Sequence, residues 1–176
     1  IATIISEKHK QMMKEILVPI VIVGQELEGY CCVYHDDYST SKEITKLMID
    51  SGCQALGYVG VTIKDKAAGR DRKNGFMDAV EEIRKEAKDI QVVAVEDILQ
   101  QNTKVDGVFC ATDSIAIGAI QAIKEEGKRI PEDISVVGIG NTRMSKVVDP
   151  ALTTASYYYK ISGTEAATML LTLING

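Results

Sequence analysis

Short apolar runs alternate along the chain with segments whose apolar residues recur every three or four positions. The runs are rich in Val and Ile, which is typical of strands buried on both faces of a parallel sheet. The run Ile-Val-Ile-Val at 20–23 is the plainest, since Pro19 precedes it and Gly24 ends it. We predict strands at residues 1–5, 20–23, 55–61, 91–95, 106–111 and 134–139.

The segments between these strands have helical spacing. In the segment 39–51, Ile44, Leu47 and Met48 fall on one face, and Gly52 follows as a usual helix stop. We predict further helices after a cap at Ser6, over 72–87, from a cap at Thr112 or Asp113 through 123, and from about 162 to 173. This alternation predicts a doubly wound parallel α/β fold, in which ligands bind at the carboxyl ends of the strands.

Arg72 is the most informative residue among the segments that follow predicted strands. Those segments are 24–25, 61–72, 112–113 and 140–141. A guanidinium at a strand-end cleft can hold paired hydroxyls or a carboxylate with its fixed fork of donors. The pattern leaves two interpretations open: a ligand-binding arginine, or a surface arginine paired with Asp71.

Composition narrows the class of protein. The 176 residues are 45% hydrophobic and 26% charged, with a net charge of −5. These values indicate a globular chain of one domain or two small ones and argue against disorder. No apolar run reaches the roughly 18 residues of a membrane span, so we expect no membrane partner. Without a basic excess, these residues are not expected to bind nucleic acid themselves.

The remaining motifs point away from an enzyme. Gly138-Ile139-Gly140 is not continued by the third glycine of a dinucleotide-binding loop, and neither a Walker loop nor a Gly-x-Ser-x-Gly elbow occurs. The four cysteines lack disulfide spacing, and we interpret them as reduced, buried thiols of a cytoplasmic protein. The adjacent Cys31 and Cys32 make a poor metal site, and the 35–37 segment His-Asp-Asp is interpreted as a helix start rather than a metal or catalytic site. We predict no cofactor and no metal.

Three segments together resemble the effector-binding core of the LacI/GalR family of bacterial transcription regulators. They are 57–60 with 72–76, then 105–119 with 127–138, and finally 149–154. The run Ile-Pro-Glu-Asp-Ile-Ser-Val-Val-Gly at 130–138 is the most specific of them.

The resemblance implies a type I periplasmic-binding-protein fold, with two Rossmann-like lobes joined by a hinge that the chain crosses three times. Residues 1–34 and 158–176 would form an incomplete N-lobe, and 35–157 the C-lobe. The family usually has a helix between Val95 and Val105, where this chain is short. A DNA-binding helix-turn-helix and the first N-lobe strands are expected before Ile1.

The resemblance also implies a small ligand, usually a sugar, held between the lobes. Arg72 matches the family's effector-binding arginine, whereas the strand-end residues at 24, 112 and 140–141 depart from the common pattern. The segments 24–25 and 139–143 are similar to those of sucrose-responsive repressors of Gram-positive bacteria, and a disaccharide or phosphosugar is a candidate effector. The expected ligand-binding residues are Gly24, Gln25, Arg72, Thr112, Asn141 and Tyr159.

Regulation in this family works through a homodimer. A ligand that contacts both lobes favours one lobe orientation, which changes the spacing of two DNA-reading domains on operator DNA. The expected dimer contacts are Ile117, Met144, Val147 and Val148, although core packing explains Val147 and Val148 equally well. Two alternatives stay open: an extracytoplasmic sugar receptor of a transporter, and an α/β enzyme. The cysteines and the 131–138 run favour the regulator.

Overall fold

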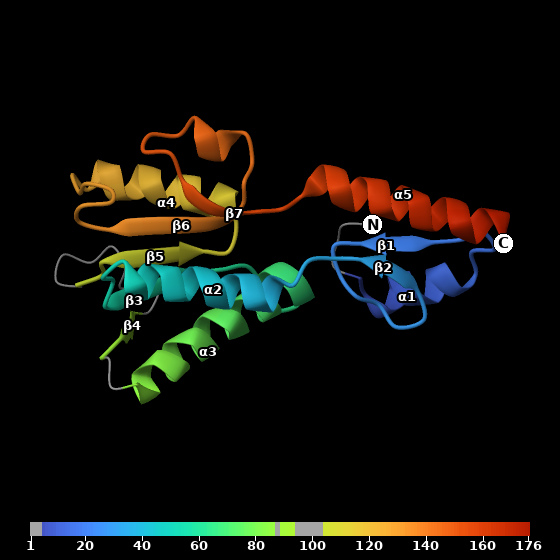
Figure 1. The fold of residues 1–176 in the computed structure, drawn as a ribbon, viewed down its shortest axis with the longest axis horizontal. Coiled ribbons are helices and arrows are strands. Elements are labelled where there is room, and N and C mark those ends of the chain that lie inside the picture. Colours follow the sequence, from blue (N-terminus) through green and yellow to red (C-terminus); the bar gives the residue numbers. More distant parts are fainter. Residues whose placement is uncertain (1–4, 87–88, 94–103) are drawn as a thin grey trace.

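Two separate parallel sheets organise the chain (Figure 1). The computed structural model describes residues 5–86, 89–93 and 104–176. The smaller sheet pairs β1 (Val21–Val23) with β2 (Cys31–Val33). The larger has the order β4 (Gln91–Val93), β3 (Ala55–Val59), β5 (Gly107–Cys110), β6 (Ser135–Gly140) and β7 (Thr153–Ser156). The helices are α1 (Glu7–Lys14), α2 (Asp37–Asp50), α3 (Arg72–Lys85), α4 (Asp113–Glu125) and α5 (Tyr159–Asn175).

The direction in which the chain adds strands to the larger sheet reverses at β3. The chain goes from β3 outward to β4 and then returns to pair β5 on the other side of β3. Gly57 of β3 consequently lies beside Val93 on one side and Val108 on the other. The carboxyl ends of β3 and β5 flank this switch point, where doubly wound sheets bind ligands.

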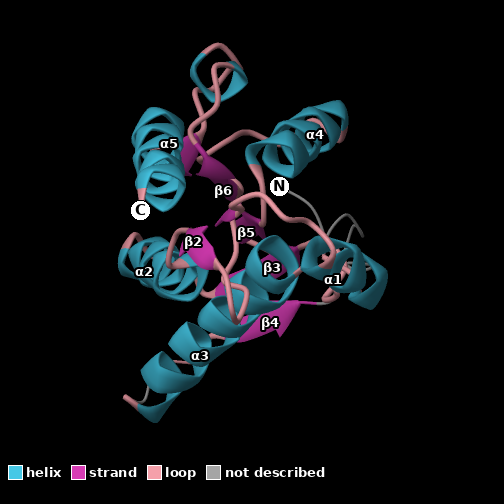
Figure 2. Ribbon diagram, turned by 90° about the vertical axis from the view of Figure 1, so that its right-hand side faces the viewer, coloured by secondary structure: helices cyan, strands magenta, loops and turns pink. Residues whose placement is uncertain are grey.

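Successive residues of each strand point to opposite faces of the larger sheet and pack into two apolar layers, one on each face. Helices α2 and α3 cover one face and α4 covers the other (Figure 2). Phe109 and Val137 point into the first layer, while Val108 and Val136 point into the second. Strands buried on both faces in this way explain the continuous apolar runs in the sequence.

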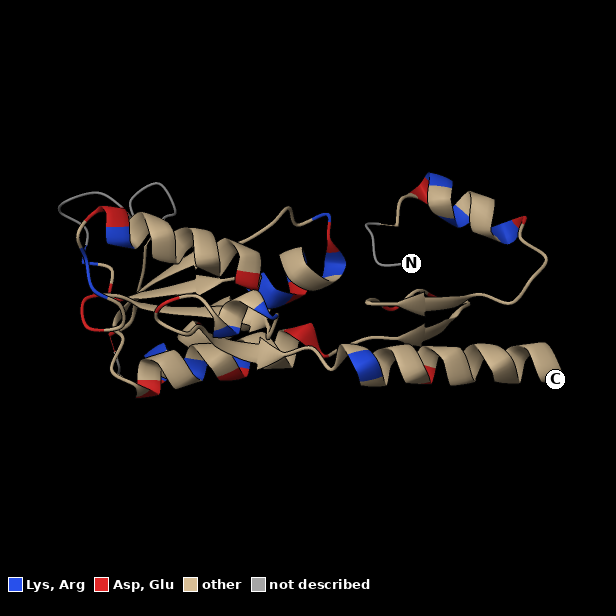
Figure 3. Cartoon of the chain, turned by 90° about the horizontal axis from the view of Figure 1, so that it is seen from above, with Lys and Arg blue, Asp and Glu red and all other residues tan. Residues whose placement is uncertain are grey.

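The smaller sheet has much less cover. Helices α1 and α5 lie on opposite sides of its two strands (Figure 3). No residue of α5 is buried, although its sequence is largely apolar, and Leu171 and Ile174 are more than half exposed. None of the helices in the described ranges is both long and apolar enough to cross a bilayer.

The predicted elements are confirmed where the apolar signal is strong. The predicted strands at 20–23, 55–61, 106–111 and 134–139 are present with somewhat different bounds, and the helix predicted over 39–51 is α2. The predicted strand at 1–5 and the short 95–105 segment fall wholly or mostly outside the described residues. Thr112 is confirmed as the cap of α4, since its side chain accepts a hydrogen bond from the Ile115 amide.

Several elements were missed for identifiable reasons. β2 is three residues long and lies in the apolar run 30–34, which the prediction overlooked, whereas β7 is an edge strand of small and polar residues without an apolar run. The segment 66–71 forms a π-helical turn, η1 (Lys66–Asp71), rather than a loop, and α5 begins at Tyr159 rather than 162. The buried-thiol prediction is wrong for Cys31, which is exposed, and Cys32 is only partly buried, whereas Cys53 and Cys110 are buried.

Helices α2 and α3 approach each other closely at Gly75. A Cβ atom at that position would overlap the Tyr38 carbonyl oxygen and press on the Ser41 side chain. The Ser41 hydroxyl also donates a hydrogen bond of 2.5 Å to the carbonyl of Arg72, the first residue of α3. This contact fixes the start of α3 against α2.

Gly75→Ala should lower the free energy of unfolding by about 1–3 kcal/mol, because the backbone contact at Tyr38 leaves the new methyl group no room. Urea unfolding followed by circular dichroism measures it. Gly118→Ala is the matched control: Gly118 lies in α4 with nothing close to its missing Cβ, so alanine there should raise stability by about 0.5–1 kcal/mol. Equal effects of both substitutions would contradict the close approach.

Candidate functional site

Arg72 lies at the carboxyl ends of the central strands and is almost completely buried, with 4% of its surface exposed. Its Nε donates to Asp37 Oδ1 at 2.7 Å, and its two terminal nitrogens donate to the Ala111 carbonyl and the Tyr157 hydroxyl. The alternative of a surface arginine paired with Asp71 is therefore wrong. Asp71 instead faces Arg70, at 3.5 Å.

Asp37 reaches Arg72 from the first turn of α2. The neighbouring Asp36 caps this helix, because its side chain accepts the Ser39 amide at 2.9 Å, and this hydrogen bond lowers the Asp36 pKa. The positive helix end favours both carboxylates. Asp37 itself turns inward and is 5% exposed, so it neutralises a guanidinium that could not otherwise remain buried.

Tyr157 completes the cluster from the segment that leaves β7. Its hydroxyl donates to Asp37 and accepts from Arg72, and its ring centre lies 5.1 Å from the Arg72 guanidinium carbon. Burial raises the pKa of Tyr157 well above its usual value. The hydroxyl therefore remains protonated and bridges the carboxylate and the guanidinium. Sequence reasoning placed Tyr157 only at a lobe boundary and missed this role.

A second polar cluster joins the ends of β5, β6 and β7. Asp113, 1% exposed, accepts hydrogen bonds from Thr154 Oγ1 at 2.5 Å and from the Thr142 amide at 2.7 Å. Gly140 lies against this carboxylate with a φ of +150°, where a Cβ atom would crowd it. The next residue, Asn141, has a φ of 49°, and its side chain donates to Ser156 Oγ at 2.8 Å.

The structure brings four of the six expected ligand-binding residues to the same sheet edge. Arg72 bonds the carbonyl of Ala111, directly before Thr112, and Tyr159 stacks on Tyr157 at 5.7 Å. Asn141 lies nearby, because the Tyr157 amide donates to the Gly140 carbonyl.

Gly24 and Gln25 belong to the other sheet, directly after β1. The Gly24 amide donates to the Val33 carbonyl of β2 at 2.9 Å, and Gly24 has a φ of +98°, which glycine adopts readily. Glu26, two residues after Gly24, forms an ion pair of 3.0 Å with Lys66 of η1. This pair joins the end of β1 to the segment that leads into Arg72.

Tyr58 adds an unpaired hydroxyl close to Arg72. Its ring packs on Phe76 and Phe109, with centroid distances of 5.2 and 5.3 Å. Its oxygen is the one buried side-chain polar atom without a hydrogen-bond partner in the ranges the structure describes. Burial raises the pKa of Tyr58 to about 12, which the Arg72 charge partly opposes. A buried hydroxyl in this state can bind a ligand or a water at little cost.

The expected dimer residues lie around α4 and η3 (Met144–Lys146). Met144 and Val147 are 57% and 70% exposed, so core packing is excluded for Val147. Val148 packs against the apolar layer beneath α4, and Ile117 is half-buried on that helix.

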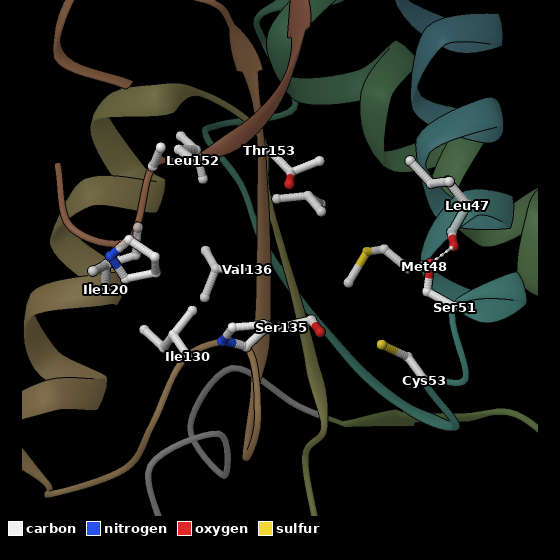
Figure 4. Close-up of a pocket in the computed structure, with 14 residues that line it drawn as sticks. Leu47, Met48, Ser51, Cys53, Ile120, Ile130, Ser135, Val136, Leu152 and Thr153 are labelled. Atoms are coloured by element: carbon white, nitrogen blue, oxygen red, sulfur yellow. Dashed lines mark hydrogen bonds between the residues drawn. The ribbon is translucent and has the colours of Figure 1, made fainter. Parts of the chain in front are cut away.

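A cavity of about 250 Å³ lies at the amino ends of β6 and β7, where Ser135 and Thr153 line it (Figure 4), whereas Arg72 lies at the carboxyl ends of the central strands. Its walls are mainly apolar and include Met48, Ile120, Val136 and Leu152. Among the described residues, no group of three or more His, Cys, Asp or Glu side chains is arranged to hold a metal. This cavity therefore offers a hydroxylated ligand fewer polar groups than the cluster around Arg72.

Comparison with known proteins gives consistent matches. Residues 45–176 match the family model described as periplasmic binding protein-like domain. The sucrose operon repressor of Staphylococcus xylosus is 30% identical over 98% of this chain and 56% of its own length, and the repressor PurR of Pasteurella multocida is 34% identical over 74% of this chain and 42% of its own. The chain spans about half the length of the curated relatives it matches.

Solved structures show the same fold. A LacI family regulator from Enterococcus faecium, solved with bound ribose, superposes with a TM-score of 0.81 at 24% identity. The match covers 97% of this chain and 68% of that one.

Asp37→Asn should lower the free energy of unfolding by about 3–5 kcal/mol, because it leaves the buried Arg72 charge without its counter-ion. The measurement is urea unfolding at pH 7. Asp149→Asn is the control, since Asp149 is 95% exposed and its pair with Lys124 should contribute at most about 1 kcal/mol. An Asp37→Asn effect as small as that of the control would argue against a buried ion pair.

Proposed function

The chain belongs to the periplasmic binding protein-like domain family, in the form carried by LacI-family transcriptional regulators, and we propose that it is the effector-binding domain of a sugar-responsive repressor. The observation that carries the proposal is the buried Arg72 cluster at the switch point of the larger sheet. The curated relatives of the chain include a sucrose operon repressor and the repressor PurR, which favours this function over an extracytoplasmic receptor or an enzyme.

The ligand we propose is a sugar, held by Gly24, Gln25, Arg72, Thr112, Asn141 and Tyr159. Arg72 supplies charged donors, and Asn141 supplies an amide. The Tyr159 side chain is 60% exposed, and its ring supplies a flat apolar face of the kind on which a pyranose packs. The similarity to a sucrose operon repressor supports a disaccharide, and the cationic Arg72 also suits a phosphosugar.

We assign residues 1–34 and 158–176 to one lobe and 35–157 to the other. This division follows the two sheets, since the described chain passes between them at 34–36 and again at 157–158. The proposed ligand residues come from both lobes: Gly24 and Gln25 follow β1, whereas Arg72, Thr112 and Asn141 surround the larger sheet. A sugar that binds both sets stabilises the lobe orientation in which both can reach it.

The regulator acts as a homodimer, in this proposal, and contacts operator DNA through a domain outside the 176 residues. The net charge of −5 is consistent with a DNA contact located elsewhere. A change in lobe orientation within each subunit then alters the spacing of the two DNA-reading domains. We place the protein in the cytoplasm, where its DNA lies.

Sugar binding is tested with the purified chain, first by thermal shift and then by calorimetry. One panel holds neutral mono- and disaccharides, including sucrose and ribose, and a second holds sugar phosphates. A bound sugar should raise the melting temperature, since binding to the native state stabilises it. Arg72→Lys should weaken that binding about tenfold or more, because lysine keeps the charge beside Asp37 but lacks the planar donor fork.

Lys124→Ala is the control for the binding measurement, since Lys124 lies on the exposed side of α4. Circular dichroism should show that both variants remain folded. If no sugar in either panel binds the wild-type chain, the sugar proposal is wrong. If sugars bind Arg72→Lys as tightly as wild type, Arg72 does not contact the ligand.

Val147→Asp should shift the dimer toward monomer, because it introduces an unpaired charge into a proposed apolar contact. Sedimentation equilibrium of the full-length regulator measures the mass. Leu47→Asp is the matched control, since Leu47 is an apolar residue of α2 that is 52% exposed. A dimer unaffected by Val147→Asp would locate the interface elsewhere.

A further inference from the structure

Tyr157 occupies a position that connects the Arg72 cluster to the smaller sheet. It lies in the segment 157–158 that leads from β7 of the larger sheet to α5, and α5 packs on β1 and β2. Its hydroxyl is bound by Arg72 and Asp37, two residues that belong entirely to the larger sheet and its helices. Residues of the larger sheet and its helices thus hold the Tyr157 side chain, while the Tyr157 backbone begins the connection to the smaller sheet.

The Tyr157 ring also contacts a residue of the other connecting segment. His35, in the other connecting segment, packs edge-on against the ring with centroids 4.3 Å apart. A hydrogen bond of 3.1 Å then joins His35 Nε2 to Ser162 Oγ, in the first turn of α5. Each step is a direct contact, so the described path runs from Arg72 through Tyr157 and His35 to Ser162.

We propose that Tyr157 is a positioning residue that transmits the state of Arg72 to α5. The Tyr157 hydroxyl accepts a hydrogen bond from Arg72 and donates one to Asp37, so any rearrangement of the guanidinium changes the hydroxyl's position. The ring moves with the hydroxyl, because the two are rigidly joined, and His35 and Ser162 follow through their contacts. The role of Tyr157 in regulation rests on the proposed function, in which a sugar bound at Arg72 is the signal that reaches α5.

A ligand that binds Arg72 meets a guanidinium that already makes three hydrogen bonds to the protein, while each terminal nitrogen carries a second N–H. Nε and both terminal nitrogens make hydrogen bonds to protein acceptors. Of these acceptors, Asp37 carries the compensating charge and Ala111 is fixed by the β5 backbone. Tyr157 is the neutral acceptor at the edge of the cluster, and its hydroxyl is the bond that a ligand oxygen replaces most cheaply. Ligand binding at Arg72 therefore acts first on Tyr157.

The test is a double-mutant cycle that combines substitutions of Arg72 and Tyr157. Mass spectrometry or NMR measures the hydrogen-exchange rates of the α5 amides in each variant, in the absence of sugar. Tyr157→Phe removes the hydroxyl and keeps the ring on His35. In the wild-type background, Arg72→Lys should speed exchange in the first turn of α5 by about threefold or more, although Arg72 does not contact α5. In the Tyr157→Phe background the same substitution should have no further effect, which is the non-additivity expected of residues in one network.

Two controls separate transmission from loss of structure. Tyr158→Phe removes a hydroxyl from the adjacent residue, which is 62% exposed, and should leave both exchange and its response to Arg72→Lys unchanged. Amides in the last turn of α4 should exchange equally in all variants, since the Ala111 carbonyl that Arg72 bonds precedes the other end of that helix. Additive effects of Arg72→Lys and Tyr157→Phe on α5 would overturn the proposal, as would an Arg72→Lys variant with wild-type exchange there.

The second part of the experiment repeats the exchange measurement with a sugar present. The sugar is one from the two thermal-shift panels that raises the melting temperature of the wild-type chain. The sugar should slow α5 exchange in wild type, and Tyr157→Phe should abolish that response while calorimetry finds affinity within about threefold of wild type. A full response in Tyr157→Phe would overturn the proposal. If no sugar binds the wild-type chain, the proposed function fails, and the sugar-free cycle still decides whether Tyr157 transmits changes at Arg72.

Discussion

One buried charge determines how the ends of the larger sheet are arranged. The Arg72 guanidinium lies out of solvent, and a buried cation is tolerated only where acceptors surround it. The acceptors are Asp37 from α2, the Ala111 carbonyl from β5 and Tyr157 from the segment after β7. These residues are far apart in sequence, so α2, α3, β5 and β7 must all be in place before the charge is satisfied.

The apolar layers make that arrangement possible. Helices α2 and α3 share one face of the sheet, and their close contact at Gly75 fixes the starts of both helices relative to each other. Arg72 and Asp37 lie at those two starts, within one turn of this contact. Packing on the opposite face holds α4, whose cap Thr112 and buried Asp113 form the adjoining polar cluster. The site is therefore a consequence of helix packing on a doubly wound sheet.

The smaller sheet differs in character. Its helix α5 buries none of its residues, and its apolar surface remains largely exposed in a chain about half as long as its curated relatives. Its links to the larger sheet include the two connecting segments, the Glu26–Lys66 pair, the His35–Ser162 hydrogen bond and the stacking of Tyr159 on Tyr157. Links of this kind, with no apolar core shared among the described residues, permit the relative orientation of the two sheets to change.

Local patterns in the sequence determined the strands with continuous apolar runs, the helix α2 with its Gly52 stop, the cap at Thr112 and the doubly wound class. These features depend on neighbouring residues, so periodicity and capping rules detect them. The polar edge strand β7 carries no such pattern, and β2 is only three residues long, so both depend on the strands they pair with. The same limit applied to Cys31, whose exposure depends on what covers β2.

The sequence also identified Arg72 as a candidate, but the two interpretations it allowed could not be separated by local reasoning. The obvious partner was the adjacent Asp71, yet the true one is Asp37, 35 positions away. Tyr157 is 85 positions from Arg72 and gave no signal of its own beyond a run of three tyrosines. Burial and pairing over such distances are set by the tertiary fold, because only the packing of α2 and α3 brings these charges together and excludes water from them.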